Sequence, residues 1–222
     1  MLADIIAYAD ANAQYIPGFL AASQIAIEVT LLTIVLSRIC GLIAAHGKTS
    51  PYRLLRAPAE FYIWFIRGTP TLIQVFIVYF GLPQIGLRLP PFIAGVVALG
   101  FGEGAYIAEI IRSGLSAIPR GQRESSVALG MSSLQTLRRI IVPQVIRVAL
   151  PSLTNEAITT LKNTSLLSTI TVVELTLHTQ TMIAQTFRPF EFYGLTALLY
   201  LAMTTVLTRV ARWLEKRYTL YI

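Results

Sequence analysis

The chain has 222 residues, of which 55% are hydrophobic and only 13% are charged, and its formal net charge at pH 7 is +7. Soluble domains carry about a quarter of charged residues, so this composition excludes an ordinary soluble domain and indicates one bundle of membrane helices over residues 1–222. The basic residues separate or follow apolar runs and form no single soluble patch, so we expect them to face a lipid bilayer and not a nucleic acid.

The N-terminal region lacks the charge pattern of a cleavable secretory signal. Asp4 and Asp10 precede the first apolar run, and no lysine or arginine stands there. A secretory signal begins with a basic segment, so we expect the first span to remain in the mature protein.

Five stretches are candidates for membrane-spanning helices, which need about 20 largely apolar residues each. Four runs meet this requirement readily: roughly residues 19–45, 61–82, 91–111 and 193–214. A fifth, roughly residues 145–171, carries several polar residues that can face a bundle interior while its leucines and isoleucines face lipid. Between the last two spans, residues 172–192 are expected to form a short helix or re-entrant segment ended by Pro189.

The second run contains the sequence Gly68-Thr69-Pro70. Pro70 has no backbone N–H to donate, so it interrupts helical hydrogen bonding and predicts a kink in this span. Gly68 and Pro70 are therefore also candidates for the hinge of a gate.

The third run carries an acid among small residues. Gly100 and Gly104 are four residues apart, as are Ala98 and Gly102, and this spacing permits close helix approach. Glu103 lies between them, and an ionisable residue inside a span is a functional candidate. It either binds a cationic amine of a substrate or forms a salt bridge to Arg67 or another helix.

The segment 123–141, between the third and fifth stretches, has helical periodicity and charges of both signs. Its apolar residues would form one stripe along a helix: Val127, Met131, Leu134 and Ile141. Pro119 and Gly121 mark a turn before this helix, and Pro143 is expected to end it. One interpretation is a helix that lies on the lipid headgroups; the other is a helix that docks on a soluble partner.

The basic residues orient the bundle, because cytoplasmic loops are enriched in Lys and Arg. Most of the 18 Lys and Arg residues lie around the first loop, around the segment 123–141 and at the C-terminal tail, whereas the opposite loops hold only Arg88 and Arg188. We therefore expect an outside N-terminus, a cytoplasmic C-terminus and a cytoplasmic location for the segment 123–141.

The fifth span presents a polar face. Its residues at positions i, i+4, i+7 and i+8 are Glu156, Thr160, Asn163 and Thr164. An acid with amide and hydroxyl groups suits the ammonium and carboxylate of an amino acid. The alternative is a polar seam that holds helices together.

No metal or disulfide chemistry is expected. Cys40 is the single cysteine and lies in an apolar run, and the two histidines fall near span ends without a set of further ligands.

The spacing of Glu124, Gly130, Ile140 and Pro143 resembles the EAA signature of permease subunits of binding-protein-dependent ABC importers. Four further blocks, in the same order, resemble the polar amino acid and opine subfamily: residues 65–74, 104–112, 118–122 and 161–166. The chain departs from the signature where Ser125 and Ser126 replace its two alanines and where Val142 replaces the leucine before the proline.

The resemblance implies an all-α integral membrane protein, the five-helix type I ABC importer transmembrane domain, in a bacterial inner membrane. The segment at about 121–142 would be the coupling helix that seats in a separate ATPase. Its contact residues would be Arg123, Glu124, Ser125, Ser126, Ala128, Gly130 and Met131. Glu124 would cap the helix start or pair with an ATPase arginine.

The implied partners are two ATP-binding subunits, a second identical or homologous permease and an extracytoplasmic solute-binding protein. The chain has no phosphate-binding G-x-x-x-x-G-K-[ST] loop. We therefore expect a transporter subunit that is not an enzyme and binds no cofactor, with ATP and Mg on the partner ATPase.

The substrate expected from Glu103 and Glu156 is a basic amino acid or an opine derived from one. The path would include these acids with Thr160, Asn163 and Thr164. Glutamine, glutamate or general amino acids remain alternatives. A secondary transporter that uses the two acids as proton relays is a less favoured one, since no inverted repeat is visible.

Overall fold

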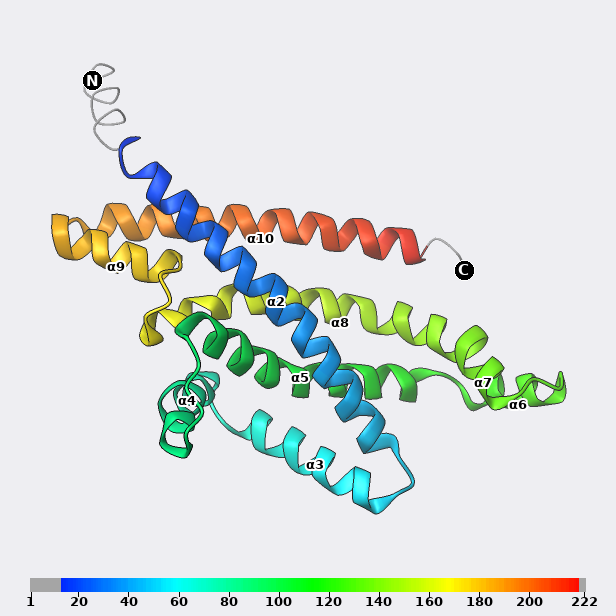
Figure 1. The fold of residues 1–222 in the computed structure, drawn as a ribbon. Helices are drawn as coiled ribbons and strands as arrows, with labels where there is room; N and C mark the ends of the chain where they lie inside the picture. Colours follow the sequence, from blue (N-terminus) through cyan, green and yellow to red (C-terminus); the bar gives the residue numbers. More distant parts are fainter. Residues whose placement is uncertain (1–12, 220–222) are drawn as a thin grey trace.

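The computed structural model describes residues 13–219, and all regular secondary structure within them is helical (Figure 1). The α-helices are α2 (Ile16–Thr49), α3 (Arg53–Gly68), α4 (Thr71–Phe76), α5 (Pro91–Ala117), α6 (Arg120–Ala128), α7 (Ser133–Thr136), α8 (Val142–Asn163), α9 (Leu175–Thr186) and α10 (Pro189–Thr219). Short π-helices, η1 (Ile77–Gly81) and η3 (Leu137–Ile141), and 3₁₀-helices, η2 (Leu82–Ile85) and η4 (Thr164–Ile170), continue some of them.

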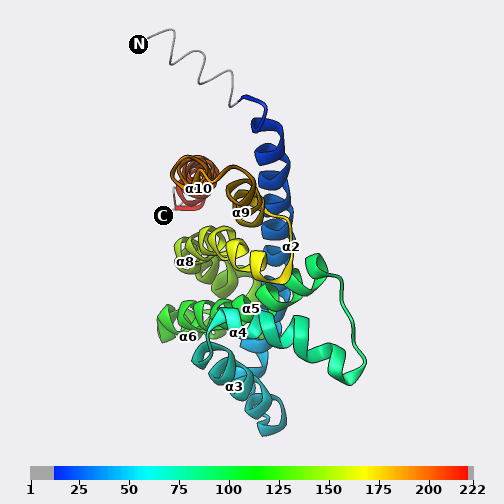
Figure 2. The same ribbon diagram turned by 90° about the vertical axis from the view of Figure 1, so that its left-hand side faces the viewer.

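The helices α10, α8, α5 and α3 lie one beside the next, and α2 crosses them obliquely (Figures 1 and 2). The packing of α2 on α5 is the most extensive in the molecule, and α5 also packs on α8 and α3. The short helices α6 and α7 project at one end of this bundle. The interior side chains therefore come mainly from α2, α5 and α8.

Four of the five predicted spans are recovered by length and composition, one of them as a bent pair of helices. By length and composition, α2, α5 and α10 can each cross a membrane, and α3 with the segment Thr71–Ile85 makes a fourth, bent pair. The fifth predicted span corresponds to α8 and η4, whose polar residues keep it below the apolarity of the others. The kink predicted at Pro70 within the second span, residues 61–82, is confirmed, and it is a full break: α3 and the segment Thr71–Ile85 are bent by 111°.

The break in the second span is held by a side chain. α3 ends at Gly68, and the predicted kink residue Pro70 caps the start of α4. The amide nitrogen of the buried Gln74 lies 2.8 Å from the carbonyl oxygen of Ile66 and 3.0 Å from that of Thr69. These carbonyls have lost their helical partners at the break, so Gln74 replaces the missing backbone donors.

Small residues set the crossing of α2 and α5, as the four-residue spacing predicted. A Cβ added to Gly104 would lie 2.7 Å from the Cβ of Cys40, and one added to Gly100 would lie 2.6 Å from the Leu36 side chain. The backbones therefore approach more closely than any larger residue permits.

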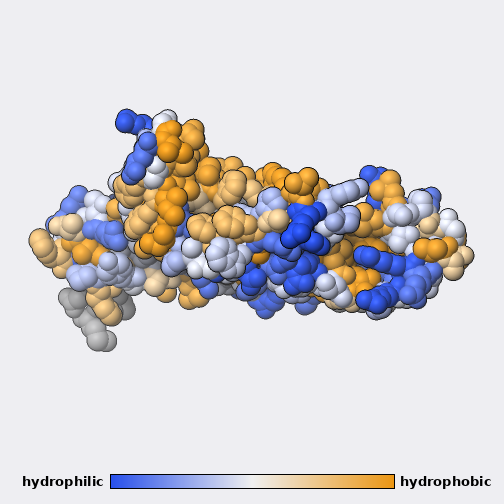
Figure 3. Space-filling view, turned by 90° about the horizontal axis from the view of Figure 1, so that it is seen from below, coloured by the Kyte–Doolittle hydropathy of each residue, from blue (hydrophilic) through white to orange (hydrophobic). Residues whose placement is uncertain are grey.

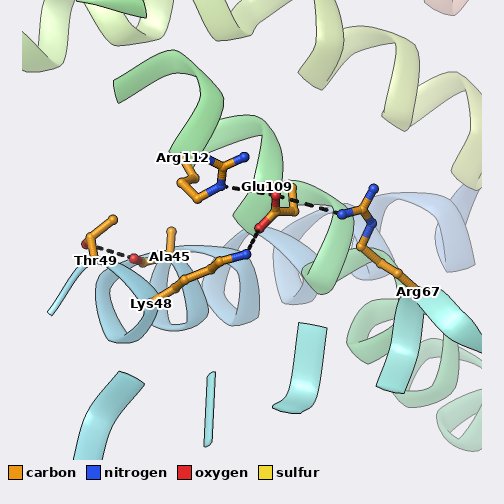
Figure 4. A network of polar contacts seen from close by, with 6 residues as sticks. All are labelled: Ala45, Lys48, Thr49, Arg67, Glu109 and Arg112. Carbon is orange, nitrogen blue, oxygen red and sulfur yellow. Dashed lines mark hydrogen bonds and ion pairs between the residues drawn. The ribbon is translucent and has the colours of Figure 1, made fainter. Parts of the chain in front are cut away.

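One carboxylate joins three helices near the ends of α2 and α3 (Figure 4). Glu109 on α5 lies 2.5 Å from the ammonium of Lys48, 3.1 Å from Nε of Arg112 and 3.7 Å from the guanidinium of Arg67. The guanidinium of Arg67 also lies 5.6 Å from the ring centre of Tyr106. Because Arg67 directly precedes the break, this network fixes the end of α3 against α5.

We expect Glu109→Gln to lower the thermal unfolding midpoint of the purified protein in detergent by several degrees. The substitution keeps the shape but leaves three cations without their shared anion, which costs about 1–3 kcal/mol. Glu60→Gln removes an exposed acid from α3 and serves as the matched control. An equal midpoint for the two variants would show that the network contributes no stability.

Candidate functional site

A buried carboxylate lies where α5 packs on α8. Glu103 is only 3% exposed, and the hydroxyl of Thr160, itself 1% exposed, donates a hydrogen bond to its Oε2 atom. The other oxygen, Oε1, is buried without a hydrogen-bond partner in the part of the chain that the structure describes. A buried carboxylate with a free acceptor is costly unless a donor or cation reaches it. Glu103 is therefore available to a ligand.

Three further groups surround this carboxylate. The Asn163 amide lies near it, and Glu156 lies close enough for electrostatic repulsion. The guanidinium of Arg38, from α2, attracts both carboxylates and also donates to the carbonyl of Ile34 at 3.0 Å. Two acids thus share one internal base, so the cluster carries a net negative charge when all three groups are ionised.

The structure brings together four of the five residues predicted for the substrate path: Glu103, Glu156, Thr160 and Asn163. Arg67 pairs with Glu109 and does not form the salt bridge to Glu103 that was the alternative. Arg38 was missed as a site residue, because the basic residues near the first loop, Arg38 among them, were used only to orient the bundle. Its position inside the first apolar run is the signal that identifies it.

The fifth path residue, Thr164, belongs to a different polar cluster. Its hydroxyl donates to the Leu161 carbonyl at 2.8 Å and lies 3.5 Å from the Tyr200 hydroxyl. Tyr200 in turn donates to Glu174 at 2.9 Å, and the fully buried Glu174 accepts from the backbone N–H groups that open α9. This cluster caps α9 and joins it to α10, which is a structural role.

The predicted coupling segment is not one continuous helix. α6 ends at Ala128, and Gly130 has φ +71°. The N–H of Gly130 donates to Val127 and that of Met131 donates to Ser126, the pattern of a left-handed helix end that glycine permits. Ser132 then opens α7 with a reciprocal capping box to Gln135. The prediction of a single rod over 123–141 is therefore wrong.

Three further details of this segment are corrected. Ile141 is buried, whereas Val127 and Leu134 are largely exposed, so the predicted apolar stripe does not exist. Pro143 does not end a helix, because it lies in the first turn of α8, where a missing N–H is tolerated. Glu124 does not cap α6, whose capping residue is Pro119.

Ser126, which replaces a signature alanine, has a structural explanation. It is 2% exposed, its hydroxyl donates to the Arg123 carbonyl at 2.7 Å, and it accepts from the Thr136 hydroxyl at 2.9 Å. This buried bond links α6 to the end of α7. The helix–turn–helix of residues 120–136 is therefore a folded unit, although its backbone turns.

The remaining contact residues lie on the outside of this unit. Exposed positions include Arg123, Glu124, Ser125, Ala128 and Gly130, and Met131 is half-buried. The large apolar side chains of Val127 and Leu129 are 70% and 79% exposed. Exposed apolar residues rimmed by charged ones are typical of a protein-binding surface.

Among residues 13–219, no three His, Cys, Asp or Glu side chains gather in a way that could hold a metal ion.

Comparisons with known proteins give relatives over nearly the whole chain. Residues 37–220 match the family described as "Binding-protein-dependent transport system inner membrane component". The chain is 38% identical over 204 residues to the glutamine transport system permease protein GlnP of Escherichia coli (strain K12), covering 91% of this chain and 93% of that protein. It is 38% identical over 217 residues to the octopine transport system permease protein OccM of Rhizobium meliloti, covering 91% and 89%.

Solved structures share the fold. One described as an amino acid ABC transporter with histidines is 36% identical, with a TM-score of 0.88 over 93% of this chain and 97% of that chain. The MetNI methionine ABC transporter, in an inward-facing conformation, is 16% identical with a TM-score of 0.78 over 93% and 98%, and it supports the fold alone. The predicted all-α importer fold is confirmed.

Proposed function

Since the chain belongs to the family of binding-protein-dependent transport system inner membrane components, we propose that it forms half of a translocation path for cationic amino acids or opines derived from them. The family membership itself makes the chain an inner-membrane permease subunit of an ABC importer for amino acids or opines. Such a subunit is a transporter component without its own ATPase site and needs no cofactor of its own.

The buried Glu103 with its unpartnered Oε1 atom is the observation that carries the proposed substrate. A cationic side chain or ammonium that enters from the path satisfies this acceptor and offsets the second acid, Glu156. The Thr160 hydroxyl orients Glu103, and in this proposal Arg38, which lies near both acids, pairs with the substrate carboxylate. An amino acid with a positive side chain therefore finds complementary charges at both ends.

A neutral substrate such as glutamine is the second candidate. Two observations favour it: the relative GlnP is a glutamine transport permease, and Arg38 already neutralises part of the acidic charge. The amide of Asn163 is suited to pair with a substrate amide.

The partners proposed for this subunit are two ATP-binding subunits that carry ATP and Mg, a second identical or homologous permease and an extracytoplasmic solute-binding protein. The unit of residues 120–136 supplies the ATPase contact through its exposed Glu124, Val127 and Leu129. With this unit in the cytoplasm, the C-terminus is cytoplasmic and the N-terminus lies outside.

The experiment that tests the substrate is uptake by the reconstituted importer carrying Glu156→Gln. Losing one carboxylate is expected to lower the uptake efficiency of arginine or ornithine about tenfold, since a charged hydrogen bond is worth about 1.5–3 kcal/mol. Glutamine uptake is expected to change much less. Glu60→Gln, which removes an exposed acid on α3, is the control. An equal loss for charged and neutral substrates would assign Glu156 a structural role.

A further inference from the structure

A half-open cavity of about 1000 Å³ shares Arg38 with the acid pair but has neither Glu103 nor Glu156 in its lining. Its walls come from the C-terminal halves of α2 and α5, the start of α6, η3 and the first half of α8. This is the end of the molecule that carries α6 and α7, where hydrophilic side chains gather with apolar ones between them (Figure 3). We call it the basic groove.

The charged lining of the basic groove has one sign. Its ionisable members among the described residues are Arg38, His46, Arg112, Arg120 and Arg123, and none is an acid. Two of the arginines have partners elsewhere: Arg38 faces the acid pair, and Arg112 donates to Glu109. The side chains of Arg120 and Arg123 make no hydrogen bond or ion pair within residues 13–219. At least two cations in the groove therefore lack an anion.

The start of α6 adds to this positive potential. The helix has nine residues, no acidic residue in its first turn and no side-chain cap, and its first residue, Arg120, lines the groove. Free N–H groups at a helix start attract anions, phosphate in particular.

Apart from Thr49 and Ser116, the remaining lining of the groove is aliphatic. Its walls include Leu42, Ile107, Ile111, Leu115, Ile146 and Leu153. Such walls offer no hydrogen bonds to a free amino acid or phosphate, but they suit a hydrocarbon chain. A ligand that fits both parts has an acidic head and an apolar tail.

We propose that the basic groove binds an acidic phospholipid from the leaflet on the α6 side of the membrane, with its phosphate at Arg120 and at Arg123, which is also a predicted ATPase-contact residue, and one acyl chain along the aliphatic walls. Basic pockets between membrane helices are recognised sites for acidic headgroups. Lipid bound here would brace α6 against α2 and α5.

The test uses the complete importer in nanodiscs that contain phosphatidylcholine with a minor fraction of phosphatidylglycerol. After mild detergent extraction, native mass spectrometry counts the phosphatidylglycerol retained on each complex. Arg120→Gln with Arg123→Gln is expected to lower retention about tenfold, since each basic side chain at the membrane surface contributes to headgroup binding. Arg53→Gln with Arg56→Gln removes two exposed cations from α3 and is the charge-matched control.

A second variant tests the acyl-chain part without changing charge. Leu115→Trp fills the aliphatic wall and is expected to reduce retention while the arginines remain. Equal retention in the groove and control variants would overturn the proposal, as would no preference for phosphatidylglycerol over phosphatidylcholine. Displacement of the lipid by soluble glycerol phosphate at matched concentration would identify a site for free phosphate and would overturn it too.

Discussion

Replacing Gly104 by alanine is expected to disrupt the packing of α2 on α5 and to reduce sharply the yield of folded protein. The added Cβ would lie 2.7 Å from the Cβ of Cys40 and 2.7 Å from the Tyr62 hydroxyl oxygen. Tyr62 cannot move freely, because its hydroxyl donates to the Phe101 carbonyl at 2.5 Å. Overpacking a filled interface of this kind costs about 1–3 kcal/mol. Size-exclusion chromatography in detergent and thermal unfolding measure the loss.

The matched control for this prediction is Gly81→Ala. A Cβ at Gly81 meets only the Ile77 side chain, at an ordinary contact distance of 3.8 Å. It makes the same chemical change in a helical segment without the clash, so it should leave yield and unfolding midpoint close to those of the parent protein. A Gly104→Ala protein as stable as Gly81→Ala would mean that the two helices can separate without cost.

The crossing of α2 and α5 also positions residues of the proposed substrate path. Gly104 is the immediate neighbour of Glu103, and the crossing of α2 and α5 is also what places Arg38 beside the acid pair. A shift of α2 away from α5 would remove the only base described near Glu103 within residues 13–219. Packing of small residues and charge placement are therefore parts of one arrangement.

Much of this fold follows from the sequence because lipid imposes simple rules. Apolar runs of sufficient length predicted the spans, and Pro70 predicted the break in the second one, since a missing N–H must interrupt a helix. The polar face of α8 was predicted to share one path with Glu103, and the structure brings Thr160 and Asn163 to that acid. These features depend on spacing within a single helix, which a sequence displays directly.

Other features depend on contacts between helices and were not predictable in this way. Arg38 was placed with the first loop, although the oblique path of α2 directs it toward Glu103. Thr164 shares a helical face with Thr160, yet its hydroxyl lies 3.5 Å from the hydroxyl of Tyr200 on α10 and so belongs to another cluster. Glu109 gave no sign of its partners Lys48 and Arg67, because they come from two other helices, α2 and α3.

In the segment 120–136, one backbone angle explains why the apolar stripe predicted from helical periodicity is absent. Helical spacing predicted a continuous apolar stripe, but Gly130 at φ +71° reverses the chain after α6. The residues beyond it face new directions, so Val127 and Leu134 do not share a face. The signature glycine is therefore the residue at which the chain turns between α6 and α7.

Replacing Gly130 by valine is expected to uncouple the proposed ATPase contact while leaving the membrane helices folded. No atom lies within 4 Å of a Cβ at this position, so the substitution meets no steric obstacle except the backbone conformation itself. A left-handed residue other than glycine costs about 1–2 kcal/mol, and a β-branched one more. Substrate uptake by the reconstituted importer should therefore fall about tenfold or more, with an unchanged unfolding midpoint of the membrane helices.

Gly130→Asn is the discriminating control for this prediction. Asparagine tolerates the left-handed conformation better than valine, because its short polar side chain can bond to the local backbone, so its uptake should lie much nearer that of the parent protein. If valine and asparagine reduced uptake equally, the loss would come from the side chain in the ATPase contact and not from the turn. If neither reduced it, coupling could not depend on this turn. Only a graded result, in which Gly130→Val loses much more uptake than Gly130→Asn, supports the left-handed turn as the element that transmits ATPase motion to α5 and α8.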